Sequence, residues 1–243
     1  MRDNVKSEAF MDSRIAFETE SIAKFSALLK EKPEADFPSR MRWAFHLHMT
    51  HQERICAMYT RGDALRDIEP FYIDFLDNFG ELISVAIDDI DYVRREYAYG
   101  LDKFYRTAAW AVLFNVDFED RKDFVERLDF FGAQKPCDIM FKRAGLLDRE
   151  INERLGGPKA FGPLLEALEN EEPEQQAALL TGFLKGWYSA LKKMNVAWIG
   201  NHKSQHDIYF GYWCFEAAAA VKVLGLDPDR FAKLPYFPRD MIY

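Results

Sequence analysis

The chain has 243 residues and a formal net charge of −8, with 49% hydrophobic and 30% charged residues. This length allows one large domain or two small ones with a sizeable core, and the composition is that of an ordinary globular protein. An acidic chain of this kind is not expected to bind nucleic acid by neutralising phosphates.

The first half of the chain shows helical spacing of apolar residues and no useful alternation of period two. The first predicted helix has one apolar stripe, and Lys32-Pro33 ends it. The stripe consists of Ile15, Ile22, Phe25 and Leu29. The second predicted helix is capped by Ser39 and runs to about Met58, with Gly62 just beyond its end.

Three further helices are predicted before residue 132. Pro70 is expected in the first turn of the third helix. Its apolar stripe is Tyr72, Leu76, Phe79, Ile83 and Ala86. The stripe of the fourth helix is Tyr97, Leu101, Phe104, Ala108 and Val112. A shorter helix carries Phe124, Leu128 and Phe131.

The composition changes after Gly132, where glycine and proline interrupt the segment 134–163. This segment contains the expected domain boundary, which gives an N-terminal helical domain at 1–132 and a C-terminal helical domain at 133–243. Pro173 fits the first turn of the helix with the clearest pattern. Its continuous seam is Ala177, Leu180, Leu184, Trp187, Leu191 and Met194.

The stretch from Tyr209 to Asp227 is predicted as the last long helix, and Gly225 is expected to end it. Before it, residues 195–205 have no periodic pattern and are expected to be irregular. Short connections between these segments predict an all-α fold, an irregular antiparallel bundle of roughly eight to ten helices.

Few features of the sequence indicate the cellular compartment of the protein. The longest uncharged apolar run, Ala108 to Phe114, is too short to span a bilayer, and the first ten residues have no apolar core typical of a signal peptide. The three cysteines form no metal pattern and favour a reducing compartment, so a cytoplasmic location is expected.

The negative charge is concentrated in one window. From residue 63 to residue 93 there are nine Asp or Glu residues and one basic residue, Arg66, a net charge of −8. Such a run is often solvated surface that aids solubility, but it also attracts a basic partner by long-range steering.

Glu216 is the candidate for buried chemistry, because it lies among aromatic residues and alanines. With His202 and His206, four residues apart, it suggests a metal-dependent hydrolase, but no further ligand lies nearby in the sequence. The other interpretation is a structural ion pair, in which a cation or hydroxyl from another helix meets Glu216. This second interpretation predicts no metal, no cofactor and no catalytic residue.

GYWCFEAAAAVKVLGLD, residues 211–227, resembles the C-terminal domain of the PoNi immunity proteins, which neutralise PoNe nuclease toxins of bacteria. The positions that carry this resemblance are Gly186, Trp187, Tyr188, Trp198, His202, Gly211, Tyr212, Trp213, Phe215, Glu216, Ala217, Ala218, Leu224 and Gly225. The start of the chain resembles the N-terminal domain of the same family through Arg2, Asp3, Phe10, Ile15 and Phe25.

The resemblance implies a non-catalytic all-α protein that binds a cognate DNase effector in the bacterial cytoplasm, in competition of the type VI secretion kind. A DNase presents a basic phosphate-binding surface, so the acidic window is the expected contact. The predicted partner-binding residues are Asp74, Asp77, Glu81, Asp88, Asp89 and Asp91. Neither nucleic acid nor a membrane is an expected partner, and a generic helical adaptor stays open as another possibility.

Overall fold

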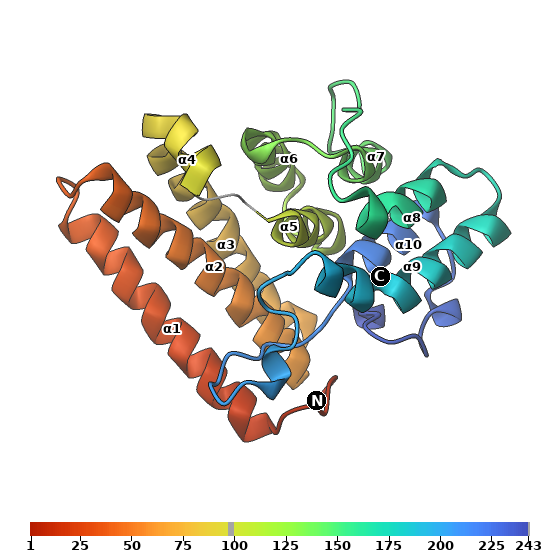
Figure 1. Cartoon of the computed structure of the whole chain (residues 1–243), viewed down its shortest axis with the longest axis horizontal. Helices are drawn as coiled ribbons and strands as arrows, with labels where there is room; N and C mark the ends of the chain where they lie inside the picture. The colour runs from red at the N-terminus through yellow and green to blue at the C-terminus, as the bar shows by residue number, and fades with distance from the viewer. Residues whose placement is uncertain (97–99, 243) are drawn as a thin grey trace. The chain divides into compact units, whose positions relative to one another are not determined.

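The computed structural model describes residues 1–96 and 100–242, and all regular structure in these residues is helical, which confirms the predicted all-α class. Figure 1 shows the α-helices along the chain. Their bounds are α1 (Glu8–Glu31), α2 (Phe37–Arg61), α3 (Leu65–Ala86), α4 (Ile90–Glu96), α5 (Leu101–Leu113), α6 (Phe118–Leu128), α7 (Lys135–Arg143), α8 (Pro158–Glu169), α9 (Pro173–Lys193) and α10 (Phe215–Leu224). No helix within the described ranges is long and apolar enough to cross a membrane.

The chain forms two compact units. Unit 1 comprises Met1–Ala98 and Gly200–Gly211, and unit 2 comprises Tyr99–Ile199 and Tyr212–Tyr243. The helices α5 and α6 precede residue 132 in the sequence but belong to unit 2, where α5 packs against α10. The domain boundary expected at 132/133 therefore does not coincide with the division into these two units. It stays a prediction.

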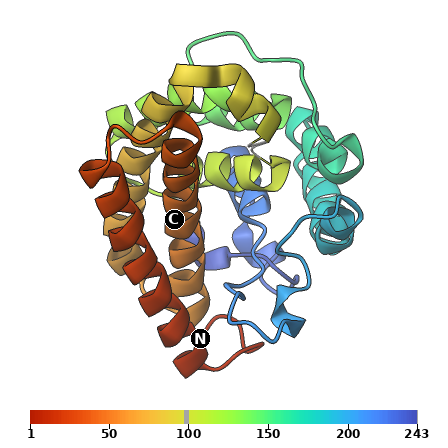
Figure 2. The same cartoon turned by 60° about the vertical axis from the view of Figure 1, so that its left-hand side comes forward.

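Unit 1 is built on α1, α2 and α3, and α2 packs against both of the others. Figures 1 and 2 show α1 and α2 running alongside each other. The second helix starts earlier than predicted, because the Asp36 carboxylate caps it by accepting from the Ser39 backbone N–H at 2.9 Å. Gly62, with φ +106°, ends α2 as predicted.

The predicted start of the third helix was wrong. Pro70 lies inside α3, whose first turn forms at Leu65, because the Ala64 carbonyl accepts from the Asp67 and Ile68 backbone N–H groups. The predicted stripe nonetheless faces the core of the unit, with Tyr72, Phe79 and Ala86 fully buried. Tyr97, assigned to the next stripe, lies outside the described residues.

Residues 200–211 complete unit 1 although they are far from it in sequence. The Thr60 hydroxyl donates to the Phe210 carbonyl at 2.8 Å, and the Arg14 guanidinium donates to the Asp207 carbonyl at 2.7 Å. The Tyr209 hydroxyl hydrogen-bonds to the Asp3 carboxylate. The first two bonds satisfy buried side chains of α2 and α1 with backbone carbonyls. Residues 195–205 were expected to be irregular, and the short 3₁₀ turn η3 (Asn201–Lys203) is their one helical element, whereas residues 209–211, expected to be helical, are not.

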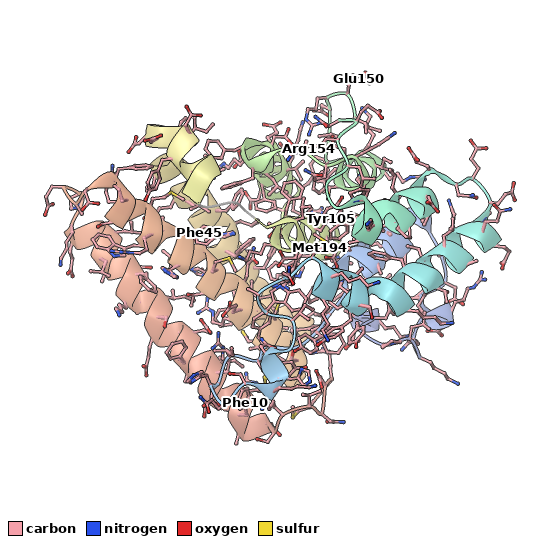
Figure 3. The ribbon with its side chains drawn as sticks, viewed as in Figure 1. Phe10, Phe45, Tyr105, Glu150, Arg154 and Met194 are labelled. Carbon is pink, nitrogen blue, oxygen red and sulfur yellow. The ribbon has the colours of Figure 1, made fainter. Side chains whose placement is uncertain are left out.

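Unit 2 has an aromatic core around α5, α8, α9 and α10. The Tyr105 and Phe161 rings stack with centroids 3.7 Å apart, and Trp110 packs edge-on against Phe215 at 5.5 Å. Pro173 occupies the first turn of α9 as predicted. Figure 3 shows Tyr105 on α5 and the loop after α7 that carries Glu150 and Arg154.

The last helix is shorter than predicted. It begins at Phe215, because residues 209–214 run without helical hydrogen bonding and the Cys214 N–H donates to the Tyr236 carbonyl at 2.8 Å. Gly211, with φ +102°, adopts a backbone conformation that favours glycine. Glu216 is thus in the first turn of α10, and Gly225 ends the helix as predicted.

Candidate functional site

The predicted acidic surface lies on the outer side of unit 1. Asp74, Asp77 and Glu81 are exposed on α3, and their spacing of three and four residues places them on one face of the helix. Asp88 and Asp89 follow in the 3₁₀ turn η1 (Ile87–Asp89), and Asp91 lies in the first turn of α4. We call these six residues the acidic face.

Three carboxylates of the acidic face already have partners within unit 1. The Arg40 guanidinium donates to Asp88 at 2.8 Å, and the Tyr92 N–H donates to the Asp89 carboxylate at 2.9 Å. Arg54 lies 3.7 Å from Asp74. These contacts hold the three side chains in place and neutralise part of the charge that the sequence places there.

Arg54 is a feature that the sequence did not indicate. Its guanidinium is buried, lies over the Phe71 ring at 4.4 Å and approaches the His51 ring nitrogen at 3.4 Å. Burial, together with Arg54, lowers the pKa of His51 to about 3. His51 is therefore neutral, and Arg54 supplies the positive charge beneath Asp74.

A second unpredicted cluster joins α1 and α2. Arg14 and Glu18, one turn apart on α1, are both buried and form an ion pair, and Arg14 also pairs with Glu53 of α2. Burial is the main cause that raises the pKa of Glu18 to about 7, Arg14 opposes the rise, and Glu53 adds to it. The cluster borders a pocket of about 470 Å³ that Phe17 and His46 also line.

Most of the aromatic residues that carry the family resemblance lie in unit 2, whereas His202 and Gly211 belong to unit 1. Trp187 is buried, and its ring lies 5.8 Å from that of Trp198. The Trp198 indole N–H donates to the buried Asp102 carboxylate at 2.7 Å. Tyr212 and Phe215 are buried, whereas Trp213 is half-buried. Their shared role is packing, because these rings contact one another inside the unit.

Glu216 is 2% exposed, as the interpretation of a buried carboxylate requires. Burial raises its pKa to about 7, while the charge of Arg106 from α5 and a hydrogen bond with Cys214 oppose this rise. Its position in the first turn of α10 also favours the negative charge. Arg106 of α5 is thus a cation from another helix whose charge acts on Glu216, and the predicted ion pair stays a prediction.

The histidines of the alternative metal site lie in unit 1. His202 is half-buried with its ring 6.3 Å from that of Tyr209, and His206 is exposed. Within the described ranges, no group of three or more His, Cys, Asp or Glu side chains is placed to hold a metal ion. The structure thus brings together no ligand set for the predicted hydrolase alternative.

The fold and these surfaces define an all-α protein with a packed aromatic unit and a helical unit that presents carboxylates. Residues 137–241 match the family model described as PoNe immunity proteins (PoNi), C-terminal, so this part of the chain is similar to the C-terminal domain of that family. The match includes the positions from Gly186 to Gly225 that carried the resemblance. Searches of curated proteins and of solved structures found no match to the chain. The resemblance at the N-terminus stays a prediction.

Proposed function

We propose that the chain is a non-catalytic immunity protein that binds and neutralises a cognate DNase toxin of the PoNe kind in the bacterial cytoplasm, in competition of the type VI secretion kind. The observation that carries this proposal is the PoNi match over residues 137–241. An immunity protein acts by binding its toxin. The aromatic residues of unit 2 are then needed for packing and not for catalysis.

The acidic face supplies a mechanism for this binding. A DNase must attract a polyanion, so its substrate site is basic. Carboxylates on the inhibitor then steer the two proteins together and compete with DNA for the same charges. Asp77, Glu81 and Asp91 are exposed, and among the described residues they form no ion pair.

The test is co-expression with a candidate PoNe nuclease, sought among the neighbouring genes, and it is scored by cell survival, co-purification and inhibition of DNA cleavage in vitro. We expect survival and a stable complex. If the chain neither binds the nuclease nor protects cells, the proposal is wrong, and a generic adaptor becomes the better interpretation. Metal analysis of the purified chain checks the hydrolase alternative, which stoichiometric zinc, manganese or iron would revive.

The acidic mechanism has its own test. Reversing Asp88, Asp89 and Asp91 to lysine changes the local charge without touching the buried core. We expect a slower association with the nuclease and a weaker dependence of that rate on salt. An unchanged rate and salt dependence in a folded variant would remove the acidic face from the mechanism while leaving the immunity function intact.

A further inference from the structure

An open groove runs along the outer side of α8 and α9 in unit 2. One section of it, with a volume of about 540 Å³, lies at the start of α9, and a second section, of about 380 Å³, extends to the end of that helix. Pro163 and Gly182 line both sections, so the groove is continuous. Only residues 170–172 separate α8 from α9, so the two helices pack against each other in opposite directions (Figure 1).

Small residues make up the side of α9 that lines the groove. Ala178, Gly182 and Gly186 recur every four residues, so they lie on one side of the helix, and all three are exposed. A Cβ added at Gly182 or Gly186 would meet nothing within 4 Å. Two glycines inside an exposed helix weaken it. They also leave its backbone open to another helix, since the distance between packed helices depends on the side chains at their contact.

The two ends of the groove carry opposite charges. Glu166 lines the section at the start of α9, whereas Lys159 and Lys193 line the section at its end. With their neighbours, the acids are Glu166, Glu171 and Glu172, and the lysines are Lys159, Lys192 and Lys193. All six are exposed, and within the described residues none of them forms an ion pair, whereas Glu169 and Glu174 are already paired. The surface therefore suits a partner that is basic at one end and acidic at the other.

A second copy of this chain has that arrangement, because the pattern is symmetric about the middle of α9. Gly182 and Gly186 are each two residues from position 184, and the groove residues Gln175 and Lys193 are each nine residues from it. A two-fold axis at this point would place the glycines of two copies against each other and each acidic end against a basic end. An antiparallel pair of copies is thus complementary in both shape and charge.

We propose that the groove between α8 and α9 is a homodimer contact, in which a second copy of this chain packs its own α8 and α9 across a two-fold axis. Glu166 of each copy then lies opposite Lys193 of the other, and the two α9 helices approach closely at their glycines. The contact is about 27 Å long and about 20 Å wide, from the helical rise and the spacing of two packed helices. This area is small for a stable dimer, so we expect a dissociation constant in the micromolar range. The inference is independent of the proposed function, because it concerns another surface and needs no toxin.

The first experiment measures the oligomeric state of the unaltered chain by sedimentation velocity at concentrations from about 1 to about 100 μM. We expect the dimer fraction to rise with concentration and to fall when salt is added, because the charges at the two ends are exposed. A chain that stays monomeric at about 100 μM would overturn the proposal.

The second experiment fills the groove with Gly182→Gln/Gly186→Gln. We expect dimerisation to weaken by about ten-fold or more, because the longer side chains keep the two α9 helices apart. The melting temperature at about 1 μM, where the chain is monomeric, should rise by about 3 °C, because glutamine favours a helix more than glycine does. The matched control is Ala9→Gln/Ala23→Gln, at two exposed positions of α1, which should dimerise like the unaltered chain. A glycine variant that dimerises as well as its control would show that the groove is not the contact.

The third experiment uses the symmetry of the charges. Glu166→Lys alone and Lys193→Glu alone should each weaken self-association by about ten-fold at low salt, because each puts like charges together twice in the dimer. A mixture of these two variants should dimerise as well as the unaltered chain, since residues 166 and 193 are again of opposite charge at both contacts. The control Glu34→Lys makes the same change in net charge as Glu166→Lys at an exposed acid of unit 1. The proposal is wrong if the mixture associates no better than either variant alone, or if Glu34→Lys weakens the dimer equally.

Discussion

Unit 1 and unit 2 both bury aromatic rings and charged side chains, but they pair the buried charges differently. Unit 2 encloses rings such as Trp110, Trp187 and Phe215, and its buried Asp138 pairs with Arg149, which is 35% exposed. In unit 1, Arg14 and Glu18 form an ion pair in which both side chains are buried. Buried rings specify a packed core, whereas buried ion pairs contribute little net stability and are sensitive to any change in their partners. We therefore expect the packing of unit 1 to depend on the Arg14–Glu18 pair as well as on its rings.

The acidic face and the family match lie in different parts of the chain. The family match covers 137–241, which includes most of unit 2 and the segment Gly200–Gly211 of unit 1. The proposed contact residues of α3 lie outside the match. If the proposed function holds, a shared core and a separate contact surface would allow proteins of this kind to keep one fold while they bind different toxins.

The largest effect should come from the core of unit 2. Trp187→Ala removes a side chain that is 2% exposed and leaves a cavity, so we expect a loss of about 4 kcal/mol in the free energy of unfolding. Urea unfolding followed by circular dichroism measures it. The control in unit 1 is Phe17→Ala, a side chain that is 58% exposed, and it should change stability little. Similar losses at both positions would contradict the comparison.

The next effect concerns the buried carboxylate of unit 2. Glu216→Ala removes a side chain that is 2% exposed and leaves a gap, so we expect a loss of about 3 kcal/mol near pH 5.5, where the carboxyl is mostly protonated. The pKa of Glu216 is raised from its ordinary value near 4.5 to about 7. The carboxyl therefore destabilises the fold progressively as pH rises from about 4.5 to 7, and this penalty stays at higher pH.

Glu216→Gln is the matched control, because the amide has nearly the same shape and no titration. It should equal the unaltered protein in stability near pH 5 and exceed it at pH 8.5, by about 3 kcal/mol at most if the pKa of Glu216 is about 7. Thermal melts at several pH values measure the difference. A difference that does not change with pH would show that Glu216 is ionised throughout, as a full ion pair requires.

Local signals predicted well the parts of the fold that depend on neighbouring residues. Pro173 and Gly225 marked the start of α9 and the end of α10, because a first turn tolerates proline and a helix end favours glycine. Pro70 led to a wrong prediction of where α3 starts. The backbone N–H groups of Asp67 and Ile68 donate to the Ala64 carbonyl, so the helix begins upstream of Pro70. The bend before Phe215 depends on Tyr236, more than twenty residues later, and no local pattern shows it.

The candidate site could be predicted in part, because some of its residues are close together in the sequence. The spacing of Asp74, Asp77 and Glu81 in the sequence was enough to expect one charged helix face. Arg54 was not foreseen, because its burial depends on which helices pack over it. The pair Arg14–Glu18 has the ordinary spacing of an exposed helical salt bridge, so only the packing of α1 against α2 shows that it is buried.

A smaller effect should come from that pair in unit 1. Arg14→Met removes the cation that opposes the rise in the pKa of Glu18, which is about 7. Glu18 then protonates more readily, so the loss should be small near pH 5 and reach about 2 kcal/mol at pH 8. The control is Lys24→Met, an exposed cation on the same helix. A loss that is equal at both pH values would show that packing by Arg14, not its charge, stabilises unit 1.

The smallest effects should come from two glycines that have equal space around them but different backbones. An added Cβ would meet nothing within 4 Å at Gly182 or at Gly200. Gly182 lies inside α9 of unit 2, so Gly182→Ala should raise stability by about 0.5–1 kcal/mol. Gly200, in unit 1, has φ +89°, so Gly200→Ala should lower stability by about 1 kcal/mol although no atom is in the way. Urea unfolding of the two variants side by side measures the signs. If both variants gain stability, the backbone at Gly200 adapts, and the segment 200–211 is held to unit 1 by its hydrogen bonds and not by its conformation.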